Sequence, residues 1–77
     1  MAVLVYFDKL SEEGTSVRYV FGEDFEEMTR CLTIDKETRR SSPDDQNVDH
    51  LFLKAFWKIS SIHDESGVWP ERGMSAS

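Results

Sequence analysis

The residues best suited to chemistry in this sequence are one cysteine and two histidines. Cys31 could act as a nucleophile if a histidine and an oxyanion hole converged on it, but no flanking motif indicates such a site. His50 and His63 are thirteen residues apart, far beyond the one-turn spacing at which two imidazoles share a metal ion. We therefore expect Cys31 to be a packing residue, both histidines to be solvated or near helix ends, and no metal or cofactor to be bound.

Acidic residues occur in pairs, which could suggest acid–base catalysis or a cation site. Such pairs occur, for example, at Glu12-Glu13, Glu23-Asp24, Glu26-Glu27 and Asp44-Asp45. Catalytic carboxylates need a cleft that raises one pKa, and a domain this small has little room for a cleft. The segment that follows Pro43 also lacks the glycine and the glutamate of a calcium loop. We interpret the pairs as solvated turns and caps, with an acidic surface for a basic partner as the alternative.

A more specific feature is a set of large apolar residues that does not fit a core. Leu53 and Trp57 are four residues apart, so on a helix they stack on the side roughly opposite the apolar stripe. Together with Trp69 they predict an interaction patch, because aromatic clusters contribute much of the binding energy at interfaces. The alternatives are that residues 68–70 fold back over Leu53 and Trp57 and cover them, or that these are single exposed apolar residues of the kind that is normal on a protein surface.

The element that would carry this patch is a helix predicted for Val48–Glu65. Its core face has apolar residues in steps of three and four, at Val48, Leu51, Phe52, Ala55, Phe56, Ile59 and Ile62. Asp45 or Asn47 could cap its first turn. Gly67 suits the left-handed residue that follows a helix, and Pro70 prevents continuation.

The residues before the helix predict strands. Ala2–Leu10 and Thr15–Phe21 are rich in β-branched and aromatic residues and are separated by a polar loop, as in a hairpin. Residues 28–35 form a third predicted strand and 38–42 a short fourth strand at the edge. Alternation places Val5, Phe7 and the odd-numbered residues from Val17 to Phe21 on the core face.

Such strands need a cover on one face, and the helix is the only candidate. The predicted fold is therefore α+β: an antiparallel β-meander of three or four strands with one C-terminal amphipathic helix packed on one face. Residues 1–69 would form this single domain, and 70–77 a loose polar tail. The opposite sheet face would show Leu4, Tyr6, Arg18, Val20, Cys31 and Thr33, which is more apolar than a solvated face needs. It could be a dimer or partner surface, it could be crossed by the tail, or its few apolar residues could simply be tolerated in water.

The charge and composition of the chain exclude some classes of partner and indicate its cellular compartment. The formal net charge of -6 and the pI of about 4.7 disfavour nucleic acid and anionic membranes as partners. A single cysteine excludes an intramolecular disulfide, which suits the reducing cytoplasm. The apolar N-terminal run lacks a basic flank and is too short to span a bilayer.

The arrangement of VRYVFGED, LTIDKETRR and VWPERG resembles that of small bacterial proteins of about this length, and this resemblance implies only that the whole chain is one self-contained unit. The sequence thus predicts a small acidic, non-catalytic, cytoplasmic protein-interaction domain of the adaptor, inhibitor or immunity type. One concrete form of such a domain is an inhibitor or immunity-type protein that binds a basic partner. There are two alternatives. One is a self-associating structural protein, and the other is a thiol- or histidine-dependent enzyme that dimerisation completes and that is centred on Cys31 or His63.

Overall fold

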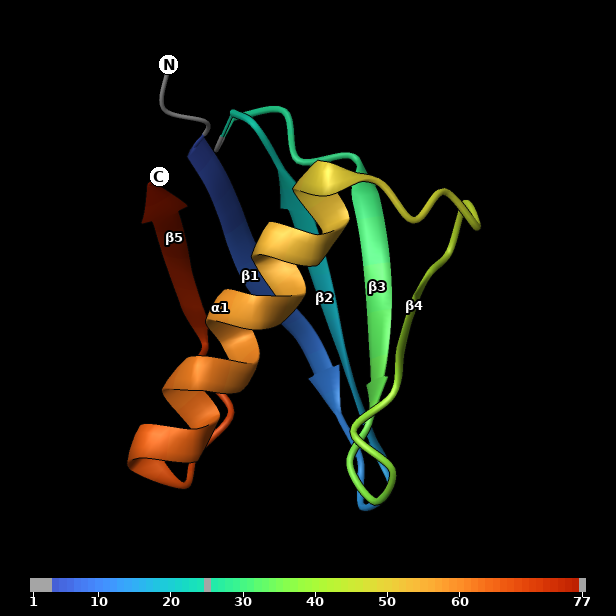
Figure 1. The fold of residues 1–77 in the computed structure, drawn as a ribbon, viewed down its shortest axis with the longest axis vertical. Helices are drawn as coiled ribbons and strands as arrows, with labels where there is room; N and C mark the ends of the chain where they lie inside the picture. The colour runs from blue at the N-terminus through green and yellow to red at the C-terminus, as the bar shows by residue number, and fades with distance from the viewer. Residues whose placement is uncertain (1–3, 25, 77) are drawn as a thin grey trace.

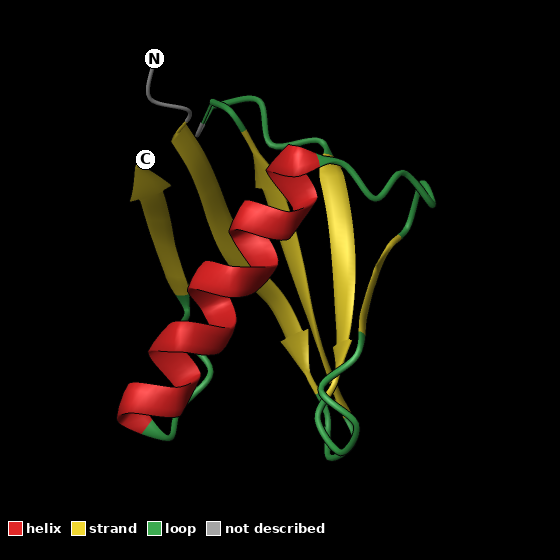
Figure 2. Ribbon diagram, viewed as in Figure 1, coloured by secondary structure: helices red, strands yellow, loops and turns green. Residues whose placement is uncertain are grey.

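The computed structural model describes residues 4–24 and 26–76 of the chain. In chain order its elements are β1 (Leu4–Glu12), β2 (Ser16–Gly22), β3 (Arg30–Asp35), β4 (Ser41–Pro43), α1 (His50–Ser66) and β5 (Arg72–Ala76). The strands form one antiparallel sheet in the order β4-β3-β2-β1-β5, and α1 crosses one face of it diagonally (Figure 1, Figure 2). The predicted α+β fold is confirmed, with five strands rather than three or four.

The core lies between this sheet face and α1. Strand alternation supplies its sheet half, since every second residue points towards the helix. The buried side chains are Val5, Phe7, Val17, Tyr19, Phe21, Leu32 and Ile34 from the sheet, Phe52, Ala55 and Ile59 from α1, and Trp69 from the segment after it. The predicted core faces of the first two strands and of the helix are thus confirmed for Val5, Phe7, Val17, Tyr19, Phe21, Phe52, Ala55 and Ile59.

The C-terminal residues correct the prediction of a loose tail. Arg72–Ala76 forms β5, which pairs antiparallel with β1 from Leu4↔Ala76 to Asp8↔Arg72. The chain therefore leaves the sheet at the β4 edge, crosses its face as α1, and returns along the opposite edge as β5 (Figure 1). Because β5 pairs with β1, β1 is not an edge strand, and the core is bounded on that side by β5.

Several boundaries also differ from the prediction. Ala2 and Val3, where the first predicted strand began, lie outside the described residues. The third strand starts at Arg30 rather than at residue 28, and the edge strand is Ser41–Pro43. Within the described residues, α1 is neither long nor apolar enough to cross a membrane.

Candidate functional site

The N-terminus of α1 is placed by an arginine that binds two carboxylates. Asp49 is the N-cap, and its Oδ1 accepts the backbone N–H of Phe52 at 3.0 Å, so neither Asp45 nor Asn47 fills the predicted capping role. Nη1 of Arg30 donates to both oxygens of Asp49, at 3.0 and 2.8 Å, and Nε donates to Asp45 at 2.8 Å. The Phe52 N–H and then Arg30 hold the pKa of Asp49 below its ordinary value. Arg30 on β3 thus ties the start of the helix to the sheet.

The C-terminus of α1 is placed by Trp69. Gly67 adopts a left-handed conformation with φ 76°, and its N–H donates to the carbonyl of His63 at 2.7 Å. The turn brings Trp69 back under the helix, where only 6% of it is exposed and its ring stacks on His63 with centroids 4.0 Å apart. The guanidinium of Arg39 lies 5.3 Å from the Trp69 ring centroid. Trp69 therefore belongs to the core and not to the predicted interaction patch.

The segment after Trp69 is held by hydrogen bonds to the sheet. The hydroxyl of Tyr19 donates to the carbonyl of Pro70 at 2.6 Å, and burial raises the pKa of this phenol. The backbone N–H of Lys9 donates to the carbonyl of Glu71 at 2.7 Å. These bonds lead the chain directly into β5 and keep it away from the outer surface of α1.

The outer surface of α1 consequently remains open at Trp57. Trp57 is 58% exposed, whereas Leu53 is half-buried and packs against the core. Residues 68–70 do not cover Trp57, since Trp69 is buried beneath the helix. Of the three residues predicted for the patch, the structure leaves only Trp57 as a prominent exposed side chain.

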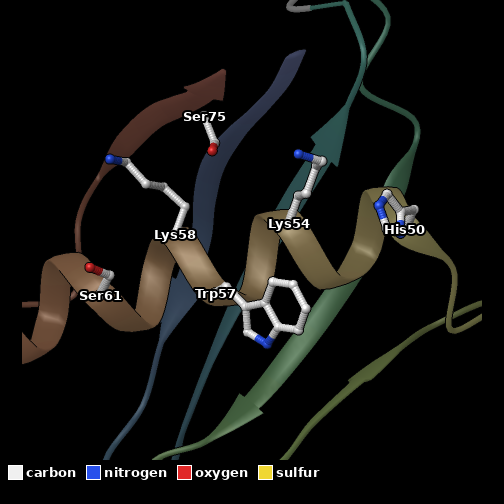
Figure 3. Close-up of a pocket in the computed structure, with 6 residues that line it drawn as sticks. All are labelled: His50, Lys54, Trp57, Lys58, Ser61 and Ser75. Carbon is white, nitrogen blue, oxygen red and sulfur yellow. The ribbon is translucent and has the colours of Figure 1, made fainter. Parts of the chain in front are cut away.

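A hollow of about 320 Å³ lies along this surface, between α1 and β5. It is lined by His50, Lys54, Trp57, Lys58, Ser61 and Ser75. Figure 3 shows Lys54 and Lys58 projecting from α1 to the side where Ser75 lies, whereas the Trp57 indole projects to the other side of the helix ribbon. None of these lining residues is acidic. We call the surface formed by these six residues the Trp57 face.

Near the Trp57 face, the acidic side chains form ion pairs but the lysines do not. Within the described part of the chain, neither Lys54 nor Lys58 makes an ion pair. The acidic residues that flank the lysines in sequence are engaged with arginines: Asp49 with Arg30 at 2.8 Å, and Asp64 with Arg39 at 3.2 Å. The face therefore carries unbalanced positive charge on an acidic protein.

A second hollow, of about 250 Å³, lies at the β1–β5 side of the sheet. It is lined by Tyr6, Phe7, Asp8, Met28, Arg72, Gly73 and Met74. On the sheet face away from α1, Leu4 and Met74 are 39% and 43% exposed. Nε of Arg72 lies 3.6 Å from Oδ1 of Asp8, so polar contacts interrupt this apolar surface.

The sheet separates the predicted reactive residues. Cys31 is half-buried and alternates with the buried Leu32, which places it on the face away from α1. His50 and His63 are on α1, on the opposite side. Among the described residues, no three histidine, cysteine or acidic side chains are grouped so that they could hold a metal ion. Within one molecule, neither histidine therefore lies on the side of the sheet that carries Cys31.

Sequence reasoning singled out Trp57 but missed the lysines beside it. Their signal was present: no acidic residue lies between Asp49 and Asp64, while Lys54 and Lys58 are one turn apart. The local charge of this stretch is positive, and the negative net charge of the whole chain hides it. Compared with known proteins, the chain matches no family model, and no curated protein or solved structure is significantly similar to it.

Proposed function

We propose that this protein is a non-catalytic protein-interaction domain whose contact surface is the Trp57 face. The observation that carries the proposal is the 58% exposure of Trp57 on a helix whose other aromatic residues, Phe52 and Phe56, are buried and half-buried. Tryptophan is among the residues that most often dominate binding energy at interfaces. Covering the exposed part of the indole would contribute about 2–3 kcal/mol from apolar area alone.

The position of Trp57 is suited to this role. The helix beneath it is anchored at both ends, by Arg30 at Asp49 and by the stack of His63 on Trp69. A side chain on a rigid element loses less conformational entropy on binding than one on a mobile loop. The helix thus presents the indole in a defined place beside the hollow.

The test is affinity capture followed by quantitative mass spectrometry, using the wild-type chain, Trp57→Ala and Leu10→Ala. Leu10 is a matched control because it is also exposed, at 53%, but lies on β1. We expect proteins captured by the wild type and by Leu10→Ala to be lost with Trp57→Ala, while circular dichroism shows all three chains folded. Equal capture by all three chains would overturn the proposal.

A second candidate function, self-association, is favoured by the sheet face away from α1. Leu4 and Met74 lie on neighbouring strands of that face and are both substantially exposed. Two-fold dimers are the commonest oligomers of soluble chains, and their interface joins the same surface on both copies, as this sheet face would. This candidate leaves the Trp57 face uncovered, so the two functions are tested by different variants.

A further inference from the structure

The Trp57 face differs in charge from the rest of the molecule. The chain has fifteen acidic and nine basic residues, yet the helix carries only Lys54 and Lys58 as full charges between Asp49 and Asp64. Like charges four residues apart on a helix repel each other modestly. Neither lysine makes an ion pair within the described residues, so nothing there offsets this repulsion.

The surrounding carboxylates do not neutralise the face. Asp49 accepts from Arg30, and Asp64 lies 3.2 Å from Arg39, so both are already paired. Glu65 is exposed and lies two turns beyond Lys58, about 10 Å along the helix axis. At that distance, which is close to the screening length at physiological salt, an exposed carboxylate has little effect on Lys58.

The hollow gives the Trp57 face an apolar surface beside its two positive charges. Trp57 lines it together with Lys54 and Lys58, and Ser75 on β5 also lines it (Figure 3). The aliphatic stem of a lysine offers apolar surface even though its end is charged. A ligand for this surface therefore needs an apolar group beside the indole and anionic groups within reach of the two ammonium groups. A protein segment with alternating acidic and apolar side chains meets both conditions.

We infer that the Trp57 face binds an acidic segment of a partner protein, whose carboxylates pair with Lys54 and Lys58 while an apolar side chain packs in the hollow against Trp57. This inference rests on the proposed function and names the chemistry of its partner. It reverses the expectation of a basic partner, which follows from the net charge of -6 but not from the local charge. Nucleic acid is disfavoured because its run of phosphates would extend beyond the two lysines onto the acidic remainder of the surface, whereas a short acidic segment stays within the Trp57 face.

The test uses two labelled synthetic peptides and fluorescence anisotropy. One peptide alternates glutamate with leucine, and the other replaces every glutamate by glutamine. We expect the wild-type chain to bind the glutamate peptide about tenfold more tightly, because two exposed ion pairs together give a difference of that order. The difference should shrink as salt concentration rises.

Variants locate the effect on the protein. The double variant Lys54→Gln/Lys58→Gln should bind both peptides equally weakly. The double variant Arg18→Gln/Arg40→Gln removes the same charge from exposed positions outside the Trp57 face and should retain the preference. Trp57→Ala should weaken the binding of both peptides.

The outcomes separate this inference from the proposed function. If the peptides bind equally and Trp57→Ala weakens both, the proposed function stands and the acidic partner is wrong. If the glutamate peptide does not bind, or binds Trp57→Ala as well as the wild type, the inference is overturned. If sedimentation shows a wild-type dimer that Lys54→Gln/Lys58→Gln dissociates, the occupant is a second copy of the chain and the inference of a separate partner is also overturned.

Discussion

Arg30 is the residue that joins the two layers of the fold at the start of α1. Besides its bonds to Asp45 and Asp49, Nη2 donates to the carbonyl of Asn47 at 2.9 Å, and the guanidinium lies 4.8 Å from the Phe21 ring centroid. Its planar group thus fixes the loop before α1 and covers an aromatic core residue. In the sequence, Arg30 looks misplaced at the start of a largely apolar strand, and only the fold supplies its partners.

We therefore expect Arg30→Met to lower the free energy of unfolding by about 1–2 kcal/mol, because the helix cap loses its charged partner while the aliphatic stem is kept. Urea denaturation at neutral pH measures this. The control is Arg18→Met, which removes a pair with Asp44 in which both side chains are nearly half exposed. That change should cost less than about 0.5 kcal/mol, and equal losses in the two variants would contradict the role of Arg30.

Glu12 gives a prediction for acid stability. Its carboxylate accepts from Lys36 at 2.8 Å and from Lys9 at 2.7 Å, and these bonds lower its pKa from 4.5 to about 2. A carboxyl group with a lowered pKa in the folded state stabilises that state above its ordinary pKa. The contribution is lost as the pH falls through the folded-state value.

Glu12→Gln should accordingly lower the free energy of unfolding at pH 7 by about 0.5–1 kcal/mol, a value kept small because Glu12 is partly exposed. The deficit should shrink between pH 4.5 and about pH 2 and vanish below it. Urea titrations over this range, with Glu13→Gln as the control of equal charge change, measure the effect. A deficit that stays constant with pH would show that the ion pairs are not its cause.

At the scale of elements, β5 shows where local sequence information ends. The sequence RGMSA has no β-branched or aromatic residue, so propensity predicts a loose tail. It becomes a strand because Tyr19 and Lys9 hold residues 70 and 71 beside the edge of β1. Strands β1 and β2, by contrast, alternate clearly, and their buried faces were predictable because a period of two leaves a direct trace in the residues.

Gly73 is the residue that lets β5 fit against the core. A Cβ atom at this position would lie 2.7 Å from Cζ of Phe7, whose side chain is 1% exposed and cannot move into solvent. We expect Gly73→Ala to lower the free energy of unfolding by about 1–3 kcal/mol, as overpacking does elsewhere. Thermal unfolding monitored by circular dichroism measures the loss.

The matched control for this change is Gly14→Ala. Nothing lies within 4 Å of a Cβ atom built at Gly14, and its φ is not positive. That variant should be neutral or slightly stabilising, because alanine restricts the unfolded chain. If Gly73→Ala were equally neutral, β5 would not be packed against Phe7 as described.

The candidate site could be predicted only in part, for a related reason. The four-residue spacing of Leu53 and Trp57 identified a helix surface outside the apolar stripe. The period could not show that Leu53 lies close enough to the core to be half-buried, nor that Trp69 turns beneath the helix onto His63. The position of Trp69 depends on how the chain runs after Gly67, and that path is set by bonds between residues far apart in sequence.

At the scale of the whole molecule, net charge opposes association of two copies. Each chain carries -6 at pH 7, so two copies repel each other, whereas near the pI of about 4.7 this repulsion disappears. The exposed Leu4 and Met74 on the outer sheet face could then drive association, since apolar burial does not depend on net charge. Self-association through this face should therefore depend on pH even though no single residue acts as a switch.

Sedimentation velocity on the wild type, Met74→Gln and Val68→Gln tests this prediction. We expect the wild type and Val68→Gln to associate weakly at pH 7 and more strongly near the pI, and Met74→Gln to associate less than either at both pH values. Val68 is a suitable control because it is 64% exposed but follows α1 and lies outside the strands. Association of Met74→Gln to the same extent would place the contact elsewhere. A wild type that stays monomeric at both pH values would leave the Trp57 face as the interaction surface for which the structure gives a reason.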